Sequence, residues 1–113
     1  MQEKIKDAIA NLIVLLVAKR YADVEALTAS IRLTRKEIET TVSDYGRTLV
    51  TPPSEAWALL NIVKVKNSTL PKWSVVMPLW TAEEQRSDLS LECTAIQKEN
   101  GLVVLELDDI HVL

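Results

Sequence analysis

The hydrophobic pattern of this chain changes its period once, and this change limits the possible folds more than any other feature of the sequence. Before about Tyr45, apolar residues recur every three or four positions, which is the spacing of one face of a helix. From about Leu59 onward they alternate with polar residues, which is typical of strands with one buried and one solvated face. Helices followed by consecutive strands on short connections predict a two-layer α+β fold.

The strongest helical pattern lies at the N-terminus, from Gln2 to about Arg20. Its apolar positions follow the i, i+3, i+4, i+7 spacing and are Ile5, Ile9, Leu12, Ile13, Leu16 and Val17. Residues 21–27 predict a second, short helix, which is too brief to be stable unless it packs against the first.

A third predicted helix is marked at both of its ends. Thr34 and Glu37 form the Ser/Thr-x-x-Glu capping box, in which each side chain bonds a backbone N–H group at the start of the helix. Gly46 is suited to the left-handed residue that ends a helix. Pro52 and Pro53 then prevent any helix from crossing that point.

About four strands are expected in the second half, over residues 59–66, 73–80, 88–97 and 102–108. We expect them to form an antiparallel meander, with the N-terminal helices packed on one face. Pro78 requires a sheet edge or a bulge, because proline has no N–H group to donate. Strand alternation leaves the other face of the sheet to Val76, Trp80, Ser90, Glu92, Thr94, Val104, Glu106 and Asp108.

Length and charge narrow the class of protein. The chain has 113 residues, of which 48% are hydrophobic, which is enough for a single domain over residues 1–113 whose core needs no disulfide or metal. Its formal charge of −3 disfavours binding to a phosphate backbone, because such binding depends on clustered Lys and Arg. We therefore expect no nucleic-acid partner.

Two features indicate a cytoplasmic protein that has no membrane partner. The single cysteine, Cys93, cannot form an internal disulfide, which suits a reducing compartment. The apolar run over residues 12–18 is too short to span a bilayer, and no small-residue cleavage pattern follows it.

The first candidate site is the charged turn after the second predicted strand. It contains Glu83, Glu84, Arg86 and Asp88, and Trp80 comes just before it. One interpretation is a solvated structural turn, in which Arg86 pairs with a neighbouring carboxylate. The other is a binding site in which Trp80 is an exposed aromatic anchor. A bulge in the strand would place Trp80 in the core instead.

The second candidate site is the sequence Asp108-Asp109-Ile110-His111, which contains the only histidine. Carboxylate and imidazole groups suit a divalent metal ion or acid–base chemistry. The spacing supplies no third ligand, so we expect no metal, no cofactor and no catalytic residue. The alternative interpretation is that His111 bonds a carboxylate and fixes the end of the chain.

The C-terminal half resembles a family of small stand-alone bacterial proteins of unassigned function. The resemblance is carried by residues 73–92 (WSVVMPLWTAEEQRSDLSLE) and 108–113 (DDIHVL), together with Tyr45-Gly46-Arg47 and Pro52-Pro53. It covers roughly residues 34–113 and leaves the first helix unmatched. Gln85 departs from the pattern, because such sequences carry glycine after the paired acidic residues, and this departure implies a different turn geometry here.

Small acidic α+β proteins of this kind are also similar to the immunity proteins encoded beside bacterial toxins, including those of contact-dependent growth inhibition. This resemblance implies a protein that binds a basic toxin domain and occludes its active surface, because acidic groups speed association with a basic partner. We expect the partner-binding residues to be Trp80, Glu83, Glu84, Arg86, Asp88, Glu92, Glu106, Asp108, Asp109 and His111.

Two other hypotheses fit the sequence. A small-ligand domain or minor enzyme predicts a pocket between the helices and the sheet, lined by Trp57, Trp73 or Trp80, in which His111 acts with a neighbouring aspartate. A homodimer predicts an exposed sheet face or edge that pairs with a second copy of the chain.

Overall fold

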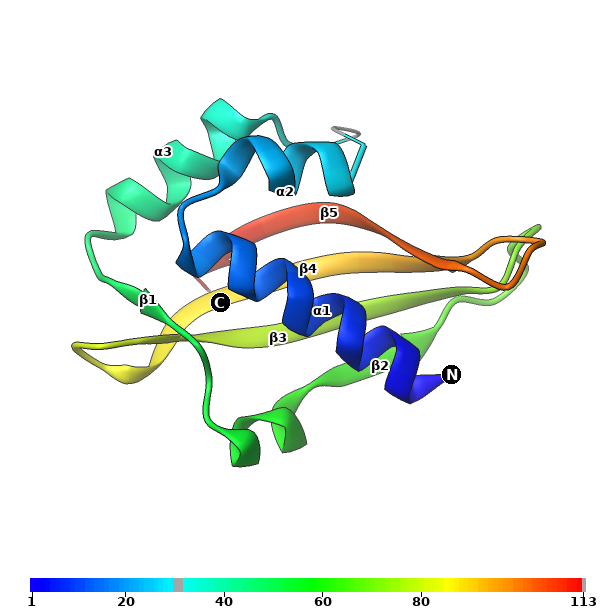
Figure 1. Ribbon diagram of the computed structural model, residues 1–113. Coiled ribbons are helices and arrows are strands. Elements are labelled where there is room, and N and C mark those ends of the chain that lie inside the picture. The colour runs from blue at the N-terminus through cyan, green and yellow to red at the C-terminus, as the bar shows by residue number, and fades with distance from the viewer. Residues whose placement is uncertain (30–31, 113) are drawn as a thin grey trace.

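The structure, a computed structural model, describes residues 1–29 and 32–112, and in these residues three helices precede the strands of a sheet (Figure 1). The helices are α1 (Gln2–Val17), α2 (Tyr21–Leu27) and α3 (Arg35–Tyr45). The elements that follow are β1 (Leu49–Val50), the 3₁₀ helix η1 (Ser54–Leu59), β2 (Asn61–Lys64), β3 (Lys72–Thr81), β4 (Gln85–Gln97) and β5 (Val103–Val112).

The sheet is antiparallel throughout, with the strand order β1-β3-β4-β5. β2 also pairs with β3, so β1 and β2 follow each other along the same edge of that strand. Figure 1 shows α1 crossing in front of the sheet, with α2 and α3 above it beside β5. This arrangement confirms the predicted α+β fold, in which N-terminal helices cover one face of an antiparallel sheet.

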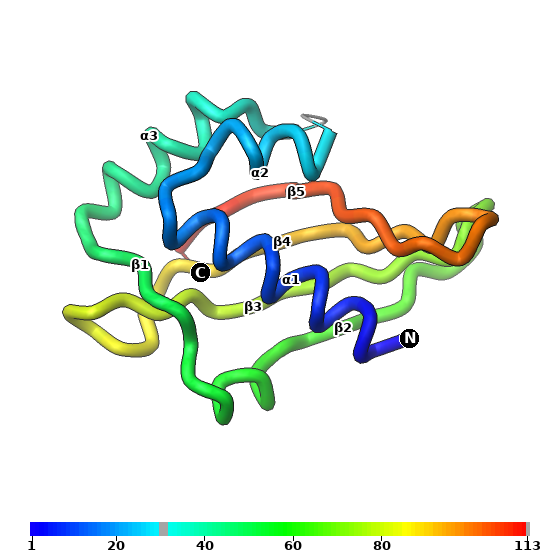
Figure 2. The backbone as a smooth tube through the Cα atoms, in the orientation of Figure 1, coloured from blue at the N-terminus to red at the C-terminus, as the bar shows by residue number. Residues whose placement is uncertain are grey.

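The face that α1 turns toward the sheet is the one that its spacing predicts. Its buried residues are Ile5, Ile9, Leu12, Ile13 and Leu16. They belong to the same hydrophobic cluster as Met77 of β3, Leu91 of β4 and Leu107 of β5. The helix ends at Val17, earlier than expected, because Lys19 takes a positive φ of 60° that helical backbone does not allow. Figure 2 shows the chain turning there into α2.

Both ends of α3 confirm the sequence signals. The Thr34 hydroxyl accepts a hydrogen bond from the Glu37 backbone N–H at 3.2 Å, and the Glu37 carboxylate accepts one from the Thr34 N–H at 3.1 Å. At the other end Gly46 has a φ of 74°, in the left-handed region where glycine is favoured. Local sequence is sufficient to define this helix because its caps are local contacts.

The strand bounds differ from the prediction in three places. The strand expected over residues 59–66 is wrong at its start, because Leu59 belongs to η1, and β2 spans only Asn61–Lys64. β4 begins at Gln85, three residues earlier than expected. β5 continues to Val112, so the acidic sequence at residues 108–111 lies within the sheet rather than after it.

Two irregularities in strand pairing set the positions of the polar side chains. Between Pro78 and Trp80 the register of β3 against β4 shifts, which confirms the bulge or edge that Pro78 requires. Between Glu92 and Cys93 the register of β4 against β5 shifts, and Asp108 is the extra residue. This second bulge reverses the alternation along β5, so that the residues beyond it face opposite sides from those a regular strand would give.

We call the sheet surface opposite the helices the open face. Its side chains, assigned from strand register, are Lys72, Ser74, Val76, Pro78, Trp80, Arg86, Asp88, Ser90, Glu92, Thr94, Ile96, Val104, Glu106, Asp108, Asp109 and His111. In residues 1–29 and 32–112 no helix covers this face. Even α1, the longest of the helices described, lacks the length and apolar content that a membrane-spanning helix requires.

Candidate functional site

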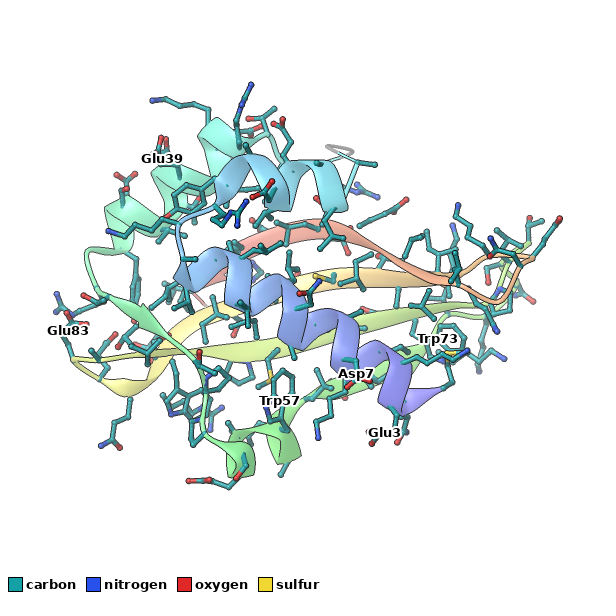
Figure 3. The ribbon with its side chains drawn as sticks, in the orientation of Figure 1. Glu3, Asp7, Glu39, Trp57, Trp73 and Glu83 are labelled. Carbon is teal, nitrogen blue, oxygen red and sulfur yellow. The ribbon has the colours of Figure 1, made fainter. Side chains whose placement is uncertain are left out.

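The turn between β3 and β4 is attached to the rest of the domain through its two glutamates, of which Glu83 is labelled in Figure 3. The Glu83 carboxylate accepts hydrogen bonds from the Thr48 backbone N–H at 2.8 Å and from the Thr48 hydroxyl at 2.9 Å. These donors, the backbone N–H first, lower the pKa of Glu83, because they favour its charged form. Glu83 therefore holds the turn against the segment before β1.

Glu84 makes the second attachment, to the end of α3. The Tyr45 hydroxyl donates to the Glu84 carboxylate at 2.8 Å and accepts from the Asp88 backbone N–H at 3.2 Å. Burial, and then the hydrogen bond to Glu84, raise the pKa of Tyr45. The turn is thus the structural turn of the first interpretation, but its partners are Tyr45 and Thr48. Arg86, the expected partner, forms no ion pair with any residue that the structure describes.

Gln85 follows these glutamates and has a positive φ of 64°. We expect Gln85→Gly to raise the free energy of unfolding by up to about 1 kcal/mol. Relief of left-handed strain stabilises the folded chain by about 1–2 kcal/mol. The greater conformational freedom of glycine stabilises the unfolded chain and offsets about 0.4–1 kcal/mol of this gain. Urea denaturation followed by circular dichroism measures the difference. Gln97→Gly, at a negative φ in the same strand, is the control and should be destabilising; a loss of stability in both variants would contradict the prediction.

Four carboxylates of the open face lie close together across β4 and β5. Glu92 is directly opposite Asp109, and Thr94 is directly opposite Glu106. The extra residue Asp108 accepts a hydrogen bond from the Thr94 hydroxyl at 2.7 Å. The Arg32 guanidinium reaches the other Asp108 oxygen at 3.4 Å and offsets one of the charges. The sequence does not reveal that Arg32 belongs here, because its position depends on how α2 and α3 pack on the sheet.

His111 lies between two of these carboxylates. Its Nδ1 is 3.0 Å from an Asp109 oxygen, and its Nε2 is 3.5 Å from a Glu92 oxygen. His111 is thus near two carboxylates, but its Nδ1 forms no hydrogen bond within the described residues, so the interpretation that His111 bonds a carboxylate and fixes the end of the chain stays a prediction. In the described part of the chain, no group of three or more His, Cys, Asp and Glu side chains is arranged to hold a metal ion.

Trp80 is half-buried and packs against the hydrophobic core, beside the register shift that follows Pro78. It pairs with Val50 on one side and with Arg86 on the other. Only part of its ring is available to a partner, so its role as an exposed anchor stays a prediction. Glu92, Glu106 and Asp108 are half-buried like Trp80, whereas Asp109 and the turn residues Glu83, Glu84, Arg86 and Asp88 are exposed.

A family model described as "Domain of unknown function (DUF7668)" matches residues 13–113. The chain belongs to this family. No curated protein and no solved structure has significant similarity to the chain. The DUF7668 match contains the whole of the open face and the turn at Glu83 and Glu84, and it begins within α1.

A pocket of about 480 Å³ lies outside the open face, where the N-terminal part of α1 meets η1 and β2. The Lys6 ammonium is 5.9 Å from the centre of the Trp57 ring there, and Figure 3 shows Trp57 below α1. His111 does not line this pocket, although the ligand-binding hypothesis places the two together. Its α1 wall, Gln2, Glu3 and Lys6, also precedes the DUF7668 match, which favours the open face as the site shared by the family.

A smaller pocket, of about 290 Å³, opens on the open face itself at the bulge in β4. Ser87 closes its inner side: the Ser87 hydroxyl donates to the Leu79 carbonyl at 2.8 Å and accepts from the Leu89 N–H at 3.1 Å. These bonds satisfy backbone groups that the register shift leaves without a partner across the strands. The sequence does not reveal this role of Ser87, because it depends on the strand register.

Proposed function

We propose that this DUF7668 protein is an immunity protein, which binds a bacterial toxin domain of the contact-dependent growth inhibition type and occludes its active surface. The observation that carries the proposal is the open face, where Asp88, Glu92, Glu106, Asp108 and Asp109 lie on a sheet with no helix over it among the described residues. Because these charges lie on strands of the sheet, they are held in fixed positions, and a partner is bound without prior ordering of a loop.

The chemistry of the partner follows from the charge of this face. A toxin domain that cleaves nucleic acid presents basic groups to phosphates, and carboxylates on a rigid surface can occupy the same groups. The formal charge of −3 on the whole chain adds long-range attraction and raises the association rate. Such a role places the protein in the cytoplasm, where the free thiol of the buried Cys93 stays reduced.

The hydrogen bonds of the turn decide which residues can be substituted to test the proposed interface. Glu83 and Glu84 are already bonded to Thr48 and Tyr45, so their reversal to lysine would disturb the fold as well as the surface. Trp80→Ala has the same drawback, because Trp80 packs against the core. The contacts of Glu92 and Asp109 stay within β4 and β5 and do not attach these strands to another part of the described fold. Together with Glu106 they are therefore better targets, and the acidic residues of β4 and β5 replace the turn as the centre of the proposed interface.

Co-expression with the neighbouring gene tests the proposal. If a toxin-like reading frame lies beside this gene, we expect the two products to co-purify and the toxin activity to fall in proportion to the amount of immunity protein added. Active toxin in the presence of excess immunity protein, with no complex on size-exclusion chromatography, would contradict the proposal. A complex of this chain with itself alone would favour the homodimer hypothesis instead.

A further inference from the structure

The pocket on the open face is lined by an apolar ring, a carboxylate, a hydroxyl and a guanidinium. Pro78 supplies an apolar wall from β3, Asp88 supplies a carboxylate, and Ser90 supplies a hydroxyl from the next position of β4 that faces the same side. Arg86 lines the end nearest to β1. At about 290 Å³ the pocket is at the lower limit of small-molecule sites, which are roughly 300–1,000 Å³, so it suits one side chain of a partner.

The Ser90 hydroxyl is available to a group that enters the pocket. The exposed fraction of Ser90 is only 4%, and Ser90 lines the pocket. Its hydroxyl forms no hydrogen bond within residues 1–29 and 32–112, and it is not one of the side-chain atoms there that are fully buried without a partner, so it can bond a guest in the pocket. Asp88 has a free carboxylate as well: only its backbone N–H is used, and its side chain forms no ion pair within the described chain.

The charge around the pocket selects a cation as the guest. Beyond Ser90 along the sheet lie His111, directly opposite it, and then the pair Glu92 and Asp109. Carboxylates therefore outnumber the single guanidinium of Arg86 near the pocket. Arg86 repels a cation from its own end, and this repulsion directs the charged head of a guest toward Asp88 and Ser90.

We infer that this pocket receives an arginine side chain of the bound protein partner, with its guanidinium between the Asp88 carboxylate and the Ser90 hydroxyl and its methylene stem on Pro78. The inference rests on the proposed function for its choice of a basic protein as the source of the guest. Arginine fits better than lysine because a planar guanidinium presents several donors at fixed angles, and so reaches a carboxylate and a hydroxyl together.

Titration with a small arginine derivative tests the pocket without any toxin. ¹⁵N–¹H spectra of the full chain would be recorded with N-acetyl-arginine methylamide, and with its citrulline analogue, which has the same shape and no charge. We expect shifts centred on the amides of Arg86, Asp88 and Ser90, a dissociation constant on the order of millimolar, and binding of the citrulline analogue at least about tenfold weaker.

Three variants locate the binding. Asp88→Asn should weaken the arginine derivative about tenfold, and Ser90→Ala about threefold, because one removes the charge and the other the free acceptor. Asp44→Asn, an exposed carboxylate at the end of α3, is the matched control and should leave binding unchanged. Equal binding of the arginine and citrulline derivatives, or shifts centred elsewhere, would overturn the inference. Failure of toxin binding with these shifts intact would overturn the proposed function and leave the cation pocket standing.

Discussion

Replacing Ile9 with alanine is expected to lower the free energy of unfolding by about 2–5 kcal/mol. Ile9 is fully buried, at the centre of the face of α1 that packs on the sheet. Alanine would leave a cavity between the helix and the strands, and close packing in the core limits how far the neighbours can collapse into it. Urea denaturation followed by circular dichroism measures the loss.

Val14→Ala is the matched control for Ile9→Ala. Val14 lies on the same helix, and its exposed fraction is 52%, so its truncation should change the free energy of unfolding by no more than about 0.5 kcal/mol. Similar losses in the two variants would mean that α1 does not pack through the predicted face. The DUF7668 match begins at residue 13, after Ile9. A large loss in Ile9→Ala would therefore show that the fold also depends on a core residue that lies before the matched region.

The helices could be predicted from sequence because their signals are local. The apolar spacing of α1 and the caps of α3 involve residues three or four positions apart. Residues that form the sequence pattern therefore also lie next to each other in the helix. β1 could not be found in this way: its two residues form a strand only because Leu49 and Val50 meet Thr81 and Trp80, far along the chain. Strands of this length depend on tertiary pairing rather than on local preference.

The candidate site shows the same division. Alternation placed Glu92 and Glu106 correctly on the uncovered face, because β4 is regular there. The placement of Asp109 and His111 on that face depends on the extra residue Asp108, which no pattern in the sequence marks.

The turn residues were harder to interpret because their partners are distant. Glu83 bonds Thr48, which is 35 positions away, and Glu84 bonds Tyr45, which is 39 positions away. The sequence of a turn rich in carboxylates does not show whether water or distant residues of the protein donate hydrogen bonds to those carboxylates. Gln85 gave the one local signal, since a residue expected to be glycine takes a left-handed conformation in the structure.

Reversing the charge of the open face is expected to weaken binding of a basic partner by at least about a hundredfold, or about 2.7 kcal/mol. The variant carries Glu92→Lys, Glu106→Lys and Asp109→Lys, which turn three attractive contacts into repulsive ones. Electrostatic repulsion should also slow association and reverse its dependence on salt, so that added salt speeds the association of the variant where it slows that of the natural chain. Stopped-flow mixing at several salt concentrations measures the rate, and calorimetry measures the affinity.

The control variant carries the same charge change away from the open face, as Glu3→Lys, Asp44→Lys and Glu99→Lys. All three residues are exposed, on α1, on α3 and in the hairpin between β4 and β5. Both variants change from a formal charge of −3 to +3, so general attraction is altered equally and only the position differs. A neutral variant, with Glu92→Gln, Glu106→Gln and Asp109→Asn, removes the attraction without adding repulsion. Its loss of affinity should be intermediate, whereas misfolding of the lysine variant would not predict this order. If the control and the open-face variants lose equal affinity, attraction by net charge explains the binding and the open face is not the interface.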